Sequence, residues 1–309
     1  MFHHFHGDGI HTKSQGSIDQ DDFYKMINFI GRNNILDADI FYEKLKNKKL
    51  KETEVCLTFD DALKCQIDIA LPVLEELKIK SFFFVYTSVF EEKPDNLEIF
   101  RYFRVNYFKN INEFYNSFYK VLDKDLKNFF NENNDKILSK KEKFPFYSIE
   151  DIKFRLVRDN FLNKSKYEEI MFLMIKEKNL NYKETYKKFF FQKNDLKKLD
   201  NLGHLVGLHS HNHPTLLEKF NYDKQKNEYE KCQSSISNIL DKSKNEIKYM
   251  SHPCGSYNND TLEILKELGV ELGFKQIMTI EPEKGMKKLN NSFLEIARQD
   301  HAKIYKSMN

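Results

Sequence analysis

The chain alternates short, strongly apolar runs with segments whose apolar residues recur every three or four positions. Residues 54–59 form one such run, residues 67–77 follow with helical spacing, and residues 81–85 are again rich in strand-forming side chains. The alternation returns at residues 194–208, where Asn194 is expected to cap a helix, and at residues 247–269, where Asp260 takes that role. Repeated strand and helix units predict an α/β protein with a parallel sheet or barrel.

Between about residues 95 and 194 the pattern changes to consecutive helices. Apolar positions from Val105 to Phe130 keep three- and four-residue spacing, which predicts one long amphipathic helix. Ser148, followed three residues later by Asp151, is typical of the start of another helix. We therefore expect a large helical subdomain inserted into the α/β framework, within one domain that spans residues 1–309.

Composition and charge narrow the class of protein. A chain of 309 residues with 40% hydrophobic and 31% charged residues is typical of a globular protein, and a net charge of +3 does not indicate a nucleic-acid partner. Four cysteines without a Cys-x-x-Cys pair predict neither a disulfide scaffold nor a zinc ribbon. No apolar run is long enough for a membrane span, and the first residues do not resemble a secretory signal, so we expect a cytoplasmic location.

Side chains that bind metals follow the predicted strands. Asp60 and Asp61 end the first strand, and His209 and His213 follow the strand at residues 205–208, in positions where active sites of barrels and open sheets lie. Adjacent carboxylates repel each other and lose solvation at such a site, and a divalent cation would relieve both effects. Two histidines four residues apart, together with one aspartate, predict a site that suits zinc and is also used by non-haem iron.

Three motifs resemble, in this order, the signature of the polysaccharide deacetylase family, carbohydrate esterase family 4. They are the Thr-Phe-Asp-Asp run at residues 58–61, the His-Ser-x-x-His-Pro run at 209–214 and the Pro-x-Gly loop at 253–255. Phe2 and His3 also resemble an aromatic-histidine pair that many members carry in their first strand. The resemblance implies a distorted (β/α)7 barrel with the helical subdomain inserted, forming a single catalytic domain. It also implies a metal-dependent hydrolase that removes acyl groups, most often N-acetyl, from sugars.

The resemblance assigns roles to the residues at the strand ends. It implies that Asp61, His209 and His213 bind a divalent metal, with zinc the expected ion, and that Asp60 is the general base. The chemistry agrees, because a metal lowers the pKa of its bound water and a neighbouring carboxylate can take the proton.

The remaining candidates lie near the third motif and the end of the chain. Many members carry an arginine two residues before the motif's proline, where this chain has Ser251, and Arg298 is our candidate for the missing guanidinium. His301 is our candidate for the general acid that protonates the leaving amine. The loop expected to contact the oxyanion and the substrate comprises Pro253, Cys254, Gly255 and Tyr257.

Several alternatives stay open at this point. The substrate is expected to be an acylated sugar or glycan precursor, but a formyl group or another small amide fits the same residues. A sugar-binding scaffold without catalysis would explain Ser251, whereas the intact Asp60 argues against it. An iron-dependent oxygenase shares the ligand types but usually carries a His-x-carboxylate motif on an all-β fold. The sequence assigns no oligomeric state.

Overall fold

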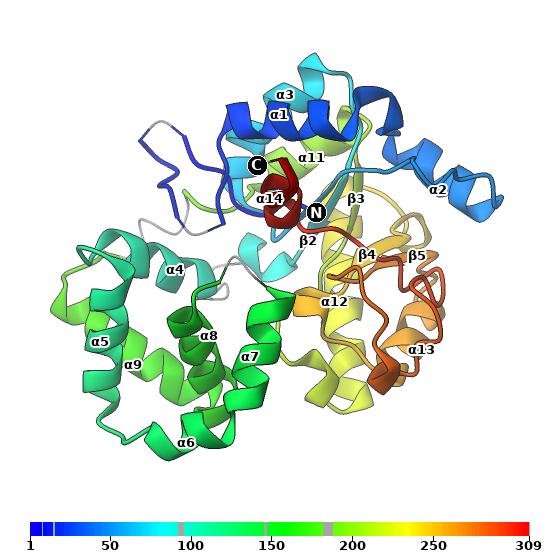
Figure 1. Ribbon diagram of the computed structural model, residues 1–309. Coiled ribbons are helices and arrows are strands. Elements are labelled where there is room, and N and C mark those ends of the chain that lie inside the picture. Colours follow the sequence, from blue (N-terminus) through cyan, green and yellow to red (C-terminus); the bar gives the residue numbers. More distant parts are fainter. Residues whose placement is uncertain (8, 15, 92–95, 145–146, 182–187, 309) are drawn as a thin grey trace. The chain divides into compact units, whose positions relative to one another are not determined.

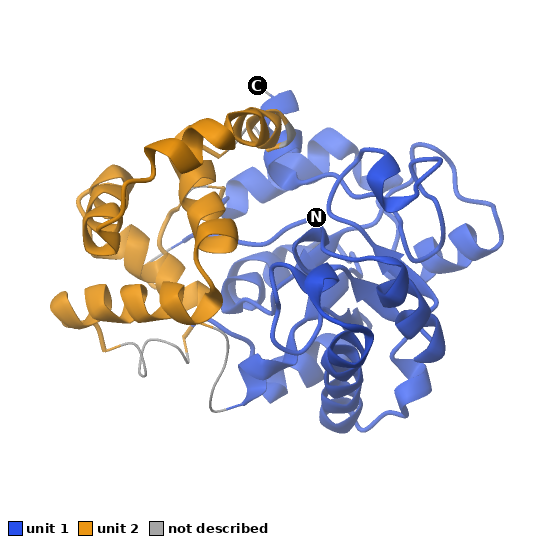
Figure 2. Cartoon of the chain, turned by 90° about the horizontal axis from the view of Figure 1, so that it is seen from below, with its two compact units in different colours: residues 1–7, 17–95, 189–309 blue, residues 8–16, 96–188 orange. Residues whose placement is uncertain are grey.

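The computed structural model describes residues 1–7, 9–14, 16–91, 96–144, 147–181 and 188–308. The chain folds into two units, which Figure 2 shows in different colours: unit 1 consists of residues 1–7, 17–95 and 189–309, and unit 2 of residues 8–16 and 96–188. Residue 95, where we placed the first boundary of the helical insertion, lies outside the described residues. The assignment of the whole chain to one catalytic domain stays a prediction.

Unit 1 contains a sheet of five parallel strands that follow one another in chain order (Figure 1). An order that never reverses is that of a barrel, whereas a doubly wound sheet changes direction at a switch point. The predicted α/β class with a parallel sheet is therefore confirmed. The strands are β1 (Thr58–Asp60), β2 (Phe82–Val85), β3 (Leu205–Leu208), β4 (Tyr249–Ser251) and β5 (Leu272–Phe274).

Single-residue pairings extend this sheet at both edges. Phe2 pairs in parallel with β1, and Ile296 pairs in parallel with β5. The two added segments then meet, because the amino group of Met1 donates to the carbonyl of Gln299 at 2.9 Å and the amide of His301 donates to the carbonyl of Met1 at 3.1 Å. Five strands and two short segments thus form a distorted ring of parallel backbone.

The alternation of side chains along β1 divides the apolar core from the polar site. Phe59 is fully buried and stacks on Phe83 of the neighbouring strand, with ring centroids 4.6 Å apart. Thr58 and Asp60 point to the opposite face, because successive residues of a strand alternate in direction. One apolar residue between two polar ones therefore anchors β1 and leaves Asp60 at the end of the strand on the face opposite Phe59.

Helices of unit 1 connect and flank these strands (Figure 1). They are α1 (Gln20–Ile30), α2 (Ala38–Lys46), α3 (Leu71–Glu76), α11 (Lys193–Asn201), α12 (Tyr222–Leu240), α13 (Asn259–Glu267) and α14 (His301–Met308). Within the ranges that the structure describes, none of the helices of either unit combines the length and the apolar character that a membrane span requires.

Unit 2 is built from helices, in agreement with the predicted insertion. The single long helix predicted from Val105 to Phe130 is wrong, because polar residues divide it. The side chain of Asn110 accepts a hydrogen bond from the amide of Glu113 and starts a new helix, which ends where Asp123 adopts a left-handed conformation. The helices are α4 (Leu97–Asn106), α5 (Ile111–Leu122), α6 (Lys127–Glu132), α7 (Asn134–Lys143), α8 (Ile149–Leu156) and α9 (Lys164–Glu177).

Candidate active site

Three predicted metal ligands converge at the ends of β1 and β3. The Nε2 atoms of His209 and His213 each lie 3.2 Å from Oδ1 of Asp61. Bonds of about 2.0 to 2.1 Å to a tetrahedral zinc ion place two ligand atoms about 3.3 Å apart, which agrees with both separations. The three side chains therefore fit a divalent cation, and zinc in particular suits two imidazoles and one carboxylate.

Hydrogen bonding prepares His209 for this role. Its Nδ1 lies 2.8 Å from the carbonyl oxygen of Ser251, and a carbonyl can only accept, so Nδ1 carries the proton. When the ring is neutral, its lone pair is thus on Nε2, which faces Asp61. Burial alone would raise the pKa of Asp61, but when the histidines are protonated, the charge of His213 and hydrogen bonds from both rings outweigh it and hold the pKa well below its usual range. A carboxylate and a basic nitrogen are therefore directed at one point, as a cation requires.

The backbone of the loops that form the site is strained at several residues. Asp61, Ala62, Ser210, His213 and Cys254 all have φ between 52° and 79°, in the left-handed region that L residues rarely adopt. Each such conformation costs on the order of 1 kcal/mol or more and persists only where surrounding contacts hold it. These loops are thus fixed by their contacts, which is typical of functional sites.

Asp60, the candidate base, lies in a network with Arg298 and Ser251. The Nη1 and Nη2 atoms of Arg298 donate to the two carboxylate oxygens of Asp60 at 2.8 and 2.7 Å, and the hydroxyl of Ser251 donates to Oδ2 at 3.0 Å. Burial would raise the pKa of Asp60, but the charge of Arg298 outweighs it and lowers the pKa to about 2. Asp60 is therefore ionised at neutral pH.

A second group of side chains lies beside Asp60. The Nε2 atom of His3 is 3.8 Å from Oδ2 of Asp60, and His3, Asp300 and His301 bring their polar atoms within 4.8 Å of one another. The ring of His301 is buried and stacks on Phe2, with centroids 5.7 Å apart. Burial lowers the pKa of His3, although Asp61 and Asp60 oppose the shift, and this makes its protonated form a stronger acid.

The sequence did not assign His3 to the site. The pairing of Phe2 with β1 brings the next residue to the end of the neighbouring strand, beside Asp60. The aromatic-histidine pair at residues 2 and 3 was the available signal.

The predicted oxyanion loop begins two residues after Ser251. It forms a tight turn in which Cys254 is exposed, and the carbonyl of Gly255 accepts a hydrogen bond from Nζ of Lys284 at 2.7 Å. Tyr257 is buried, with its ring stacked on His252 at 4.2 Å and its hydroxyl 3.3 Å from Oε1 of Glu295. Tyr257 thus packs inside unit 1, whereas Cys254 lies at the surface of the turn.

The model of the polysaccharide deacetylase family matches residues 47–137 and 159–273, which is more than half of the chain. The chain belongs to the polysaccharide deacetylase family. This membership places it among hydrolases that deacetylate carbohydrates. The match does not reach His3, Arg298 or His301, so their positions in the site come from the structure alone. No curated protein matches the chain.

Solved structures of deacetylases share the fold at low sequence identity. The Streptococcus pyogenes deacetylase PplD, in complex with acetate, is 15% identical with a TM-score of 0.55, over 100% of this chain and 96% of that one. IcaB from Ammonifex degensii is 14% identical with a TM-score of 0.53, over 99% of each chain. A de-N-acetylase from Aggregatibacter actinomycetemcomitans is 13% identical with a TM-score of 0.55, over 100% of this chain and 97% of that one. The likeness confirms the distorted barrel of polysaccharide deacetylases with an inserted helical subdomain.

Proposed function

We propose that the protein is a metal-dependent deacetylase that hydrolyses the N-acetyl group of a sugar within a glycan or glycan precursor. The observation that carries the proposal is that a set of metal-binding side chains and an ionised carboxylate lie together at one edge of the sheet. Asp61, His209 and His213 offer a ligand set, and the neighbouring Asp60 is held ionised by Arg298. A binding scaffold would need neither a ligand set nor an ionised base, so this arrangement favours catalysis.

Asp61, His209 and His213 would hold the ion, with zinc the expected one. When bound, a divalent cation polarises the acyl oxygen and lowers the pKa of a water molecule in the same site. The carboxylate of Asp60 takes the proton of the attacking water, and Arg298 keeps that carboxylate oriented and ionised between turnovers. The turn at Cys254 is the candidate source of a backbone donor to the developing oxyanion.

We assign the proton donor to His3 in preference to His301. His3 lies against Asp60, and its side chain is 19% exposed, whereas the side chain of His301 is 6% exposed and covered by Phe2. The more exposed ring can reach the leaving amine, while His301 and Asp300, whose polar atoms lie within 4.8 Å of it, can orient it. An acid at His3 would give one proton to the nitrogen as the carbon–nitrogen bond breaks.

The test is deacetylation of a panel of N-acetylated and N-formylated oligosaccharides, before and after removal of metal with a chelator. We expect activity on an N-acetyl substrate, its loss on chelation and its recovery when zinc is added. Activity that survives complete removal of metal would contradict the proposal, and preference for a formylated substrate would change the acyl group. The cytoplasmic location stays a prediction from the sequence.

A further inference from the structure

The loop between the two histidine ligands is held by a buried carboxylate from a neighbouring helix. Oε2 of Glu228, in α12, accepts hydrogen bonds from the backbone amides of His211 at 3.1 Å and Asn212 at 2.8 Å. Its Oε1 accepts another from Nδ2 of Asn212 at 2.7 Å. Glu228 is only 4% exposed, so these three donors take the place of water around a buried negative charge.

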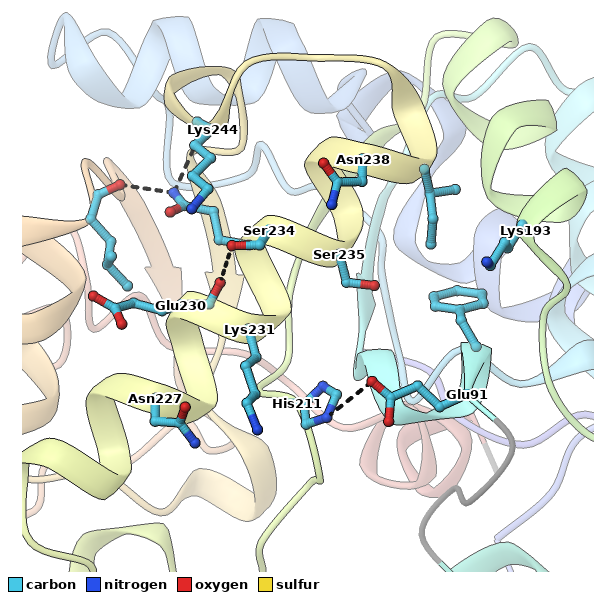
Figure 3. Close-up of a pocket in the computed structure, with 14 residues that line it drawn as sticks. Glu91, Lys193, His211, Asn227, Glu230, Lys231, Ser234, Ser235, Asn238 and Lys244 are labelled. Carbon is cyan, nitrogen blue, oxygen red and sulfur yellow. Dashed lines mark hydrogen bonds and ion pairs between the residues drawn. The ribbon is translucent and has the colours of Figure 1, made fainter.

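The same loop is tied on its other side to the segment after β2. The Nδ1 atom of His211 lies 2.9 Å from the hydroxyl of Thr87, and the carbonyl of His211 accepts from the amide of Ser88 at 2.9 Å. Figure 3 shows the ring of His211 facing Glu91, 3.4 Å from its carboxylate. His211 therefore fastens the loop and is not directed at the ligand set, although it lies between two ligands in sequence.

Helix α12 offers a fixed support for Glu228. One turn after Glu228, Sγ of Cys232 is 3.5 Å from the carbonyl oxygen of Val85, the last residue of β2. Cys232 and Tyr229, which directly follows Glu228, are both fully buried. The carboxylate of Glu228 is thus held at a set distance from the strand ends that carry the metal ligands.

The two histidine ligands differ in how they are anchored. His209 directly follows β3, its amide bonds to Val85, and its Nδ1 bonds to Ser251. His213 comes at the end of a turn in which both Ser210 and His213 have left-handed backbone conformations. The turn needs contacts to keep this shape, and Glu228 supplies them at the two intervening residues.

We propose that Glu228 is a positioning residue for the metal centre, which acts by holding the turn that carries His213 against Asp61. The inference rests on the proposed metal function of Asp61, His209 and His213. Without the carboxylate, the turn relaxes, His213 moves away, and the site keeps His209 and Asp61 alone, a poor chelate.

The experiment measures the zinc dissociation constant of the full chain by competition with a chromogenic chelator. Glu228→Met removes both acceptor oxygens from the backbone amides of the turn and should raise the constant about 10- to 100-fold, as loss of a contact around a ligand does. Glu228→Gln keeps one oxygen for the two amides, and the side chain of Asn212 can turn over so that its Oδ1 accepts from the new Nε2. This variant should therefore stay within a few-fold of the parent. Glu230→Met, an exposed position of the same helix, is the matched control and should change nothing.

The outcomes of these variants decide the proposal. Unchanged zinc affinity in Glu228→Met overturns it, and so does an equal loss in Glu228→Gln, because the hydrogen bonds to the turn would then not be the cause. If Glu228→Met does not fold, Glu228→Asp decides, since its shorter side chain withdraws the carboxylate from the turn, and an unchanged constant in that variant overturns the proposal. A parent chain whose zinc affinity does not fall in Asp61→Asn would instead contradict the proposed metal function itself.

Discussion

Arg298 holds both carboxylate oxygens of Asp60, although 238 positions separate the two residues in the chain. All five N–H groups of the guanidinium have acceptors. Besides the two bonds to Asp60, Nε donates to the carbonyl of Lys275, Nη1 to the hydroxyl of Thr58 and Nη2 to the hydroxyl of Ser251. Such a saturated guanidinium has one orientation, and it fixes the orientation of the carboxylate as well.

Replacing Arg298 should destabilise the fold as well as reduce activity. Arg298→Met leaves Asp60 buried without its counter-charge, and such a loss typically costs about 3 to 5 kcal/mol in the free energy of unfolding. Ser251→Ala removes a single hydroxyl from the same network and should cost about 1 kcal/mol. Urea unfolding of both variants measures the difference, and equal losses would mean that the ion pair does not stabilise the fold.

Substitutions at the two neighbouring aspartates should have different effects on metal content and on turnover when both are measured on the same samples. Asp61→Asn removes one of three ligands and should lose most of the bound metal. Asp60→Asn should keep nearly stoichiometric metal while deacetylation falls by orders of magnitude, because an amide cannot accept the proton of water. Elemental analysis beside the rate of acetate release checks both. The opposite pattern would exchange the two roles.

Comparing an amide with an activated ester distinguishes His3 from His301 as the acid. A general acid contributes about 10²- to 10⁴-fold in rate. His3→Ala should therefore lower deacetylation of an N-acetyl sugar within that range, and lower hydrolysis of an aryl acetate far less, since an aryl oxide leaves without a proton. His301→Ala should have the smaller effect on the amide. A larger amide-selective loss in His301→Ala would return the acid role to His301.

Buried histidines should make the fold sensitive to acid. Burial lowers the pKa of His204 from 6.5 to about 4, and Nδ1 of its neutral ring accepts a hydrogen bond from the amide of Ser81 at 3.0 Å. The unfolded chain takes up this proton near pH 6.5, whereas the folded chain resists it down to about pH 4, so stability is lost as the pH falls through that window. The loss attributable to His204 reaches about 3 kcal/mol.

His204→Asn tests this directly, because the asparagine oxygen can still accept from Ser81 but does not titrate. Chemical unfolding at pH 7, 5.5 and 4 should show a smaller loss of stability in the variant than in the parent chain. Parallel pH profiles of the two proteins would contradict the assignment. Burial also lowers the pKa of His252, to about 3. Part of the acid sensitivity should therefore remain in the variant.

Strands β1 to β4 could be predicted from the sequence because their apolar runs are short and bounded by polar residues. The strand at residues 205–208 was predicted with its observed bounds, the other three were shifted by one to four residues, and β5 was not predicted. Helix starts were less accurate, because several polar residues compete for one cap. Gln192 and Asn258 are the N-terminal caps of α11 and α13, two residues before the predicted Asn194 and Asp260.

The site could be predicted where its chemistry lies within a motif. Asp61, His209 and His213 follow strands, and the geometry of parallel strands brings such positions together. Glu228 could not be predicted, because a glutamate on an amphipathic helix has no local sign of burial. His3 belongs to a segment too short for a periodic pattern, so its only signal was the aromatic-histidine pair, and the pairing of Phe2 with β1 shows its place.

The position of Arg298, far after the proposed ligands in the sequence, also sets the order in which the site is completed during synthesis. Residues 61, 209 and 213 leave the ribosome well before residue 298, so a nascent chain carries the three proposed ligands while Asp60 still lacks its guanidinium. Until Arg298 joins the fold, Asp60 must stay hydrated or protonated, because an unpaired charge resists burial. Under the proposed mechanism, metal capture can therefore precede closure of the ring, and the ability to hydrolyse comes last.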